Sequence, residues 1–305
     1  MKKITFLLIL FINIIVFADE IIINKELSLV GGYGDNFFTE TMHHQNSIGF
    51  EYFGKHSNDY GDFLATDLQL RIAHNFEKET TTLEIHNAWL EYKLGLGKFI
   101  RLGHFALAFG IEKVKDTHAT LWQTNAMKNV GFKQDWGVGY RSFWNNFDYE
   151  FAAQIGSGMA FRKDGYLFSS RINTNSTKSL QFAISSLYGK IHKSMGMATY
   201  PLSSSMKISK KRIGFELQYE YADFKFMNEI AFGYDNDTEI LSGFSEWDYT
   251  PFVFQDLKLI VQYKYFDETS NWNFGGAYKL CETITFSTLY ELKENRILCQ
   301  IYFFG

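Results

Sequence analysis

The sequence predicts an all-β chain that closes into a transmembrane antiparallel β-barrel of about sixteen strands. From residue 26 to the end, segments of about ten residues alternate apolar and polar positions, and turns separate them. In segment 212–221, every second residue from Ile213 to Tyr221 is apolar and the residues between are polar or glycine. Because side chains in a strand alternate between its two faces, each such strand has one apolar and one polar face.

Composition also favours strands in a membrane. Aromatic residues make up 18% of the chain although its mean hydropathy is slightly negative, and aromatic girdles around a polar barrel interior produce both properties. There are only two prolines, as expected where most residues belong to a hydrogen-bonded ladder. The net charge of −4 and the lack of a basic stripe exclude nucleic acid as a partner. Cys281 and Cys299 lie about five residues out of register in the predicted hairpin, so we expect two free thiols.

The N-terminus resembles an export signal. Lys2 and Lys3 precede an apolar run over 4–17, and small residues follow near Ala18. We therefore expect a cleaved signal peptide at 1–18 and a barrel domain at 19–305. An N-terminal anchor is the weaker alternative, because the run is short and acidic residues follow it. No other stretch approaches the roughly eighteen apolar residues of a spanning helix.

The alternation places sixteen strands, an even number as in bacterial single-chain barrels, although twelve or fourteen also fit. In the fourth strand, Leu83 and Ile85 share one face but Ala88 and Leu90 switch to the other phase, which predicts a β-bulge near His86 or Asn87. The expected strands are 26–33, 46–54, 63–74, 81–93, 98–109, 134–144, 147–155, 165–172, 178–188, 208–221, 223–234, 238–248, 255–266, 270–279, 282–290 and 295–304.

The connections predict the orientation. Tight turns at 95–97, 145–146 and 222–223 follow even-numbered strands, whereas odd-numbered strands lead into long connections at 34–45, 110–133 and 189–207. A longer turn around 56–61 is the exception. Since such barrels have short periplasmic turns and longer outer loops, we expect both termini in the periplasm. The final strand ends at Phe304 followed by Gly305, whereas outer-membrane barrels usually finish on an aromatic residue that the insertion machinery reads.

One hairpin carries a more specific motif. Asn87-Ala-Trp-Leu-Glu-Tyr-Lys is followed by segment 99–112, Phe-Ile-Arg-Leu-Gly-His-Phe-Ala-Leu-Ala-Phe-Gly-Ile-Glu. This hairpin resembles the central hairpin of outer-membrane porins of the phosphate-selective O and P group, over about 88–158. The resemblance implies a homotrimer in the cell outer membrane that lets small hydrophilic solutes or ions diffuse passively. Phosphate selectivity is not carried over, because the lysine clusters typical of true phosphate channels are missing.

The connection 110–133 is the long third outer loop of this barrel, and a sixteen-stranded barrel leaves an aqueous channel unless something narrows it. We therefore expect this loop to fold inward and form a constriction in which fixed charges select ions. Solvated loop charges are the alternative. Inward acids such as Asp148, Glu216 and Glu220 argue against strong anion preference. The expected constriction residues are Arg101, Lys113, Lys115, Asp116, His118, Lys128, Lys133, Arg141, Glu84, Glu91 and Glu150.

Other classes of function have weaker support. His43 and His44 have no partners at metal-ligand spacing, so we expect no metal and no cofactor. A barrel lipase needs a serine and histidine on one strand face, and His192 with Ser194 is the nearest approach, in a predicted loop. We expect no enzyme activity. A structural barrel or adhesin with a closed lumen remains the alternative, although the modest loops and the lack of a plug domain favour an open pore.

Overall fold

The computed structural model describes residues 18–34, 46–75, 79–115, 117–118, 120–174, 179–192 and 206–305. The predicted signal peptide lies outside these residues except for Ala18, so its cleavage stays a prediction. Within the described ranges, no helix is long and apolar enough to cross a membrane.

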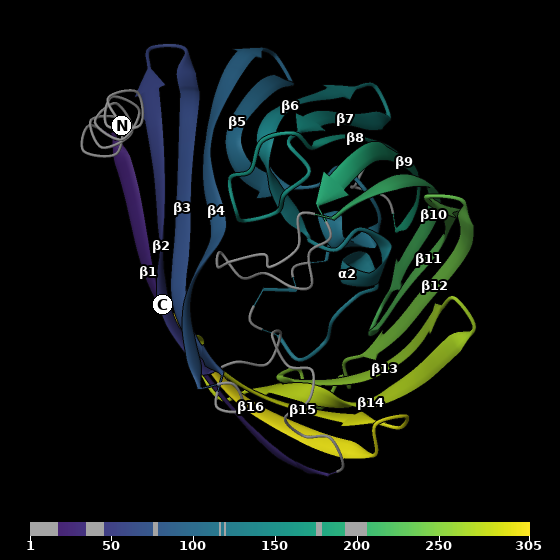
Figure 1. Ribbon diagram of the computed structural model, residues 1–305. Helices are drawn as coiled ribbons and strands as arrows, with labels where there is room; N and C mark the ends of the chain where they lie inside the picture. Colours follow the sequence, from purple (N-terminus) through teal and green to yellow (C-terminus); the bar gives the residue numbers. More distant parts are fainter. Residues whose placement is uncertain are drawn as a thin grey trace.

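Sixteen antiparallel strands form one closed barrel, in which each strand pairs with its neighbours in sequence and β1 pairs with β16 (Figure 1). This confirms the predicted fold class and strand count. The strands are β1 Glu20–Gly34, β2 Asn46–Asn58, β3 Gly61–Asn75, β4 Thr80–Gly95, β5 Lys98–Ala106, β6 Gln134–Trp144, β7 Phe147–Gln154, β8 Tyr166–Thr174, β9 Leu180–His192, β10 Lys207–Tyr221, β11 Phe224–Asp235, β12 Thr238–Tyr249, β13 Leu257–Phe266, β14 Thr269–Lys279, β15 Ile284–Glu291 and β16 Arg296–Phe304.

The apolar side of each strand faces outward. The large apolar side chains of alternate positions are exposed on the barrel exterior, while their polar neighbours are buried inside. Because a closed cylinder pairs every strand, this exterior presents no free edge and suits a hydrocarbon environment. The exposed outward residues include Val138, Tyr140, Trp144, Phe147, Phe151, Leu259, Ile297 and Ile301, which confirms the faces predicted from the alternation.

The predicted β-bulge lies in β4. The β3–β4 register passes from Gln69 opposite Asn87 to Leu70 opposite Ile85, so His86 is the extra residue. One extra residue shifts the phase of the alternation, and this is why the outward positions change from Ile85 to Ala88. His86 itself points inward and is buried.

The connections differ in length between the two ends of the barrel. We call the end that holds the chain termini the terminal end, and the opposite one the loop end. At the terminal end the turns 59–60, 96–97, 145–146 and 222–223 have two residues each. The longer turn expected at 56–61 was wrong: β2 continues to Asn58, whose side chain accepts from the Tyr60 backbone N–H (2.9 Å), and Gly61 (φ 96°) takes a left-handed conformation.

The expected alternation of lengths fails in the second half of the chain. At the loop end, connections 236–237 and 267–268 are also two-residue turns, whereas 250–256 at the terminal end is longer. Pro251 lies in that connection and cannot donate to a ladder, which favours a loop there. Long connections at the loop end are therefore concentrated between β1 and β10.

Gly305 takes part in closing the barrel. Its backbone N–H donates to the Lys25 carbonyl (3.0 Å), and the Lys25 N–H donates to the Gly305 carbonyl (2.7 Å). A Cβ at this position would lie 2.7 Å from a Thr283 methyl carbon, so a larger terminal residue requires a shift there. Cys281 and Cys299 are free, as predicted.

Candidate functional site: a loop folded into the barrel lumen

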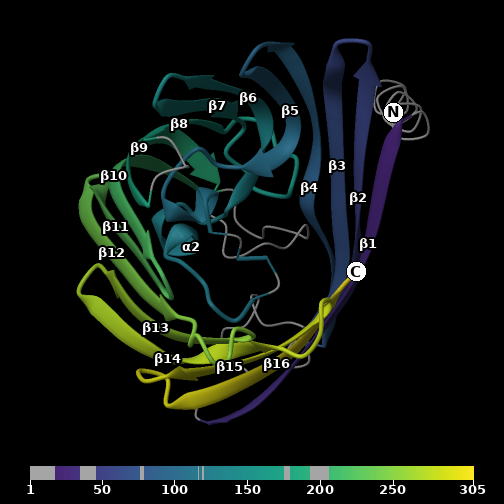
Figure 2. The same cartoon turned by 180° about the vertical axis from the view of Figure 1, so that it is seen from behind.

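The described residues of segment 107–133, which connects β5 to β6, lie inside the ring of strands. The segment contains a 3-10 turn (η2, Ile111–Lys113) and one turn of helix (α2, Ala126–Asn129), and α2 lies within the ring in both views (Figures 1 and 2). β5 ends at Ala106, so Leu107 to Phe109, predicted as strand, belong to this segment. The segment is called the lumen loop below.

Apolar side chains attach both ends of the lumen loop to one sector of the wall. Leu107 and Phe109 from its start and Val130 and Phe132 from its end form a buried cluster. The wall side of that cluster consists of residues from β8, β9 and β11, namely Leu167, Leu187, Ile191 and Ala231. Burying apolar surface on both sides removes it from water, which stabilises the loop inside the lumen.

The middle of the loop is buried against a second sector. Leu121 and Trp122 pack with Ile260, Leu289 and Leu298 from β13, β15 and β16. These wall residues point into the lumen, at positions where a water-filled barrel has polar side chains. Apolar residues on the inward face therefore mark the surface that the loop covers.

Glu229 on β11 holds the start and the end of the loop together. One carboxylate oxygen accepts the Ile111 backbone N–H (2.6 Å), and the other accepts the side-chain amide of Asn129 (3.0 Å). The chain approaches this carboxylate closely at Gly110 (φ 72°), where a Cβ would lie 2.4 Å from Glu229 Oε2. The left-handed conformation favours glycine at 110, and a larger residue would also require the Glu229 carboxylate to shift.

Asn125 provides a further anchor next to α2. Its side-chain amide donates to the Gly243 carbonyl (2.7 Å) on β12 and to the Tyr265 carbonyl (2.9 Å) on β13. Lys264 on β13 donates to the Gln123 carbonyl (3.2 Å). Side chains of the loop and the wall thus satisfy backbone carbonyls of the opposite partner inside the lumen.

Carboxylates on three different strands receive basic groups of the lumen loop. Lys113 Nζ lies 2.6 Å from Glu150 Oε1 on β7, and Lys115 pairs with Glu246 on β12. His118 Nε2 lies 2.5 Å from Glu26 Oε2 on β1, and its ring contacts that of His86 on β4 with a centroid distance of 4.0 Å. The loop therefore reaches from the β8–β11 sector across to β1 and β4.

A charged cluster lies on the wall beside Lys113. Arg101 Nη2 is 2.7 Å from one oxygen of Glu91, and Arg141 Nη2 is 2.5 Å from the other. Arg141 and Glu150 are register partners across β6 and β7, which brings Lys113 to the same place. We call Glu91, Arg101, Lys113, Arg141 and Glu150 the charged cluster. The Arg141 side chain is 35% exposed, so water reaches the cluster at this cation.

The remaining predicted constriction residues lie elsewhere. Glu84 is fully buried and paired with Arg71 (2.5 Å), so it faces no open path. Lys133 pairs with Glu112 within the loop itself (3.0 Å), and Lys128 lies on α2. Arg171 on β8, which is not among the predicted residues, is a further inward arginine and binds Glu216 with two hydrogen bonds, at 2.8 and 2.9 Å. Asp116, His43 and His44 lie outside the described residues. Among the residues that are described, no group of three or more side chains could hold a metal ion.

The sequence analysis missed the wall carboxylates that hold the loop, namely Glu26, Glu229 and Glu246. A signal for the contact surface existed: Leu167, Leu187, Leu289 and Leu298 stand at inward positions of their strands. An apolar side chain on the lumen-facing side of a strand, where contact with water is expected, indicates that another segment covers it. The partner of each carboxylate is not predictable in this way, because the loop has no periodic pattern.

No protein-family model matches the sequence, and no curated protein matches it. Solved structures are similar over nearly their whole length. OmpF of Salmonella typhi, solved with daunomycin, gives a TM-score of 0.64 at 10% identity, covering 93% of this chain and 97% of that one. A loop-deleted OmpT, an outer membrane protein of Vibrio cholerae, gives a TM-score of 0.61 at 11% identity, covering 94% of this chain and 99% of that one. An anion-selective porin from Comamonas acidovorans gives a TM-score of 0.60 at 10% identity, covering 94% of this chain and 99% of that one. The chain therefore has the fold of the sixteen-stranded outer-membrane porins.

Proposed function

We propose that this protein is an outer-membrane porin through which small hydrophilic solutes or ions diffuse passively. The observation that carries this proposal is the lumen loop, which narrows the barrel interior while leaving a partly exposed charged cluster beside it. An apolar exterior around a polar interior is the arrangement of a pore in lipid. The termini face the periplasm, and the loop end faces outward.

The lumen loop and the charged cluster form the constriction in this proposal. Solutes pass the Glu91, Arg101 and Arg141 side chains, whose charges order water and act on ions at short range. Lys113 and Lys115 each have a wall carboxylate as partner, so their charges are largely neutralised, and His118 also contacts a wall carboxylate. We therefore expect weak rather than strong charge selectivity, and no preference for phosphate.

The alternative is a structural barrel or adhesin whose lumen the loop closes. The contact of His118 with β1 and β4 favours this alternative, because the loop then extends across the lumen from its anchors on β8 to β11. The exposure of Arg141 favours the pore. An enzyme has no support from the geometry: His192 Nε2 hydrogen-bonds the Lys163 carbonyl (3.1 Å), and Ser194 lies outside the described residues.

Liposome swelling separates these two functions. Liposomes that contain the refolded barrel are diluted into isotonic uncharged sugars of increasing size. A porin predicts swelling that slows as the sugar grows, because the constriction sieves by size. A closed barrel predicts no swelling with any sugar. Heat-modifiability on a gel is the control for folding, and empty liposomes are the control for leakage.

A further inference from the structure

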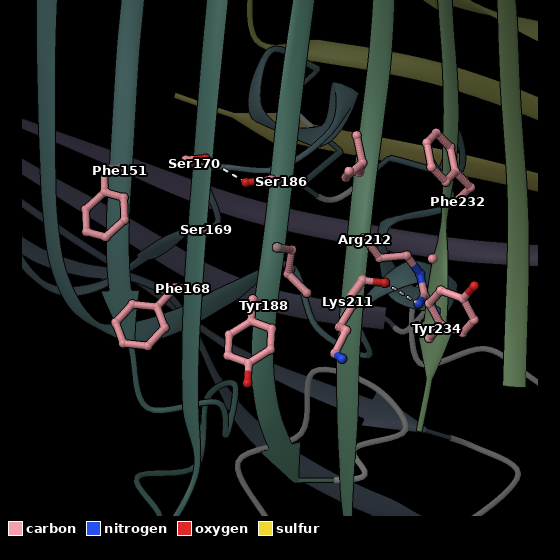
Figure 3. A pocket seen from close by; sticks show the side chains of 13 residues that line it. Phe151, Phe168, Ser169, Ser170, Ser186, Tyr188, Lys211, Arg212, Phe232 and Tyr234 are labelled. Carbon is pink, nitrogen blue, oxygen red and sulfur yellow. Dashed lines mark hydrogen bonds between the residues drawn. The ribbon is translucent and has the colours of Figure 1, made fainter. Parts of the chain in front are cut away.

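The outward face of β8, β9 and β10 carries a groove where the barrel exterior elsewhere carries large side chains. The groove has a volume of about 400 Å³ and lies among the side chains in Figure 3. Ser170 and Ser186, joined by a hydrogen bond of 2.8 Å, stand at outward positions and leave the surface hollow. Phe168 on β8 and Phe232 on β11 also line the groove. A groove of this size falls in the range of roughly 300–1,000 Å³ that ligand sites occupy.

The groove opens at the level of an aromatic girdle. Lys211 lies in it, and its register partners on the two neighbouring strands are Tyr188 and Tyr234. A second girdle follows on the same strand at Tyr219 and Tyr221. Ten residues separate Lys211 from Tyr221, which at about 3.3 Å per residue and a tilt of about 40° is roughly 25 Å, the height of the apolar band of such barrels. Lys211 is thus at the membrane interface, on the loop end.

Exposed lysines lie at this level, and the exposed acid Glu239, the register partner of Tyr234, lies one strand beyond the groove. Lys211 has no ion-pair partner among the described residues, and Lys190, two positions beyond Tyr188, is exposed as well. Arg212 also borders the groove, but its guanidinium turns inward to Asp235 (2.6 Å). No acidic residue is among the described lining residues. Glu239 accepts a hydrogen bond from the Tyr234 hydroxyl at 3.3 Å.

We propose that this groove binds an anionic, phosphate-bearing lipid of the outer leaflet, with one acyl chain along the serine floor and a phosphate at Lys211. The inference rests on the membrane placement in the proposed function and goes beyond the pore. An apolar groove below a lysine and two tyrosines matches the acyl chain of a lipid below its phosphate headgroup. A second copy of the chain fits less well, because docking would bury the Lys211 and Lys190 charges with no acid opposite them on the groove.

The test is lipid binding by native mass spectrometry. The refolded barrel in detergent is titrated with diphosphoryl lipid A, and separately with a neutral diacyl galactolipid as the phosphate-free comparison. Two variants address the site: Lys211→Gln removes the charge, and Ser186→Phe fills the groove. Their matched controls are Lys98→Gln, an exposed lysine at the terminal end of β5, and Ser270→Phe, an exposed serine on β14.

The proposal predicts tighter retention of diphosphoryl lipid A than of the galactolipid. Lys211→Gln weakens the binding of diphosphoryl lipid A about fivefold, as expected for one lysine at an anionic lipid surface. Ser186→Phe abolishes this binding, and both controls bind the lipid like the wild type. Equal binding by all variants overturns the proposal. The proposal is also overturned if the wild type forms an oligomer that binds no lipid and that Ser186→Phe dissociates. The groove would then bind a second copy of the chain. Single-channel conductance is unchanged in all four variants; a silent barrel that still binds the lipid refutes the pore and leaves this site intact.

Discussion

At the scale of single residues, the charged cluster depends on two arginines that share one carboxylate. Glu91 binds Arg101 with one oxygen and Arg141 with the other, and Arg101 also lies over the Trp89 ring at 4.2 Å. Arg101 is thereby fixed against the wall, whereas Arg141 is the more exposed cation. Arg141 is therefore the residue whose charge we expect to affect ions most in the proposed pore.

We predict that Arg141→Glu shifts ion preference towards cations. The substitution changes the local charge by two units, which at about 4–8 Å in water changes the free energy of a passing ion by roughly 1–2 kcal/mol. The cation-to-anion permeability ratio should rise severalfold, measured as the reversal potential under a KCl gradient. Lys98→Glu is the matched control, because Lys98 is exposed on the outward alternation of β5. Identical reversal potentials in the two variants would remove Arg141 from the pathway.

Much of this cluster was predictable from alternation. Arg101, Arg141 and Glu150 stand at polar positions of strands whose other faces are apolar, and period two assigns them to the lumen. The link to Lys113 was not predictable in the same way, because Lys113 lies in a 3-10 turn whose path depends on Glu229 and on apolar packing. Pairing between a loop and a distant strand leaves no local pattern in the sequence.

At the scale of the element, the lumen loop is held by side chains from most of the wall. Its apolar anchors lie on β8, β9, β11, β13, β15 and β16, and its ionic anchors on β1, β7 and β12. Loop and wall approach each other closely at Gly110 and Glu229. This contact joins the two ends of the loop, so a larger side chain at 110 acts on both of them.

Gly110→Val should displace the loop without unfolding the barrel. The new Cβ would lie 2.4 Å from the Glu229 carboxylate, and a β-branched residue at φ 72° costs about 1–3 kcal/mol. Trypsin should then cleave at the loop lysines at least several times faster, because the loop leaves the wall more often. The matched control is Gly31→Val, where a Cβ meets nothing within 4 Å. If both variants are cleaved at the wild-type rate, the loop is not held at Gly110.

At the scale of the whole molecule, the two ends of the barrel define its orientation. Cys281 is exposed in the connection 280–283 at the terminal end, and its hydrogen bonds with Thr283 lower the pKa of the thiol. A lower pKa increases the thiolate fraction near neutral pH, so Cys281 should react readily with maleimides. Its position makes it a natural marker of the end that we propose to face the periplasm.

We expect a polyethylene-glycol maleimide, too large for the pore, to leave intact cells unlabelled and to label Cys281 once the outer membrane is permeabilised. Cys281→Ser should abolish this labelling, because Cys299 points outward within β16. A cysteine at Glu294, in the connection 292–295 at the loop end, should react on intact cells. Labelling of Cys281 on intact cells would reverse the orientation.

The sequence predicts the whole molecule better than it predicts the lumen. Strand count, closure, outward faces and the bulge at His86 follow from period two and its one interruption. Loop lengths are less reliable: turns 236–237 and 267–268 are short at the end where long ones were expected. How much of the lumen the loop fills depends on how tightly the loop packs, and no repeating pattern encodes that packing.

The most direct test of the central claim is the single-channel conductance of the refolded protein in a planar bilayer under a KCl gradient. We predict stepwise currents with a small reversal potential, because the loop narrows the lumen while its cations are paired with wall carboxylates. Steps that come in threes would in addition support a trimer. A folded, heat-modifiable barrel that gives no current would contradict the account and identify the lumen loop as a plug.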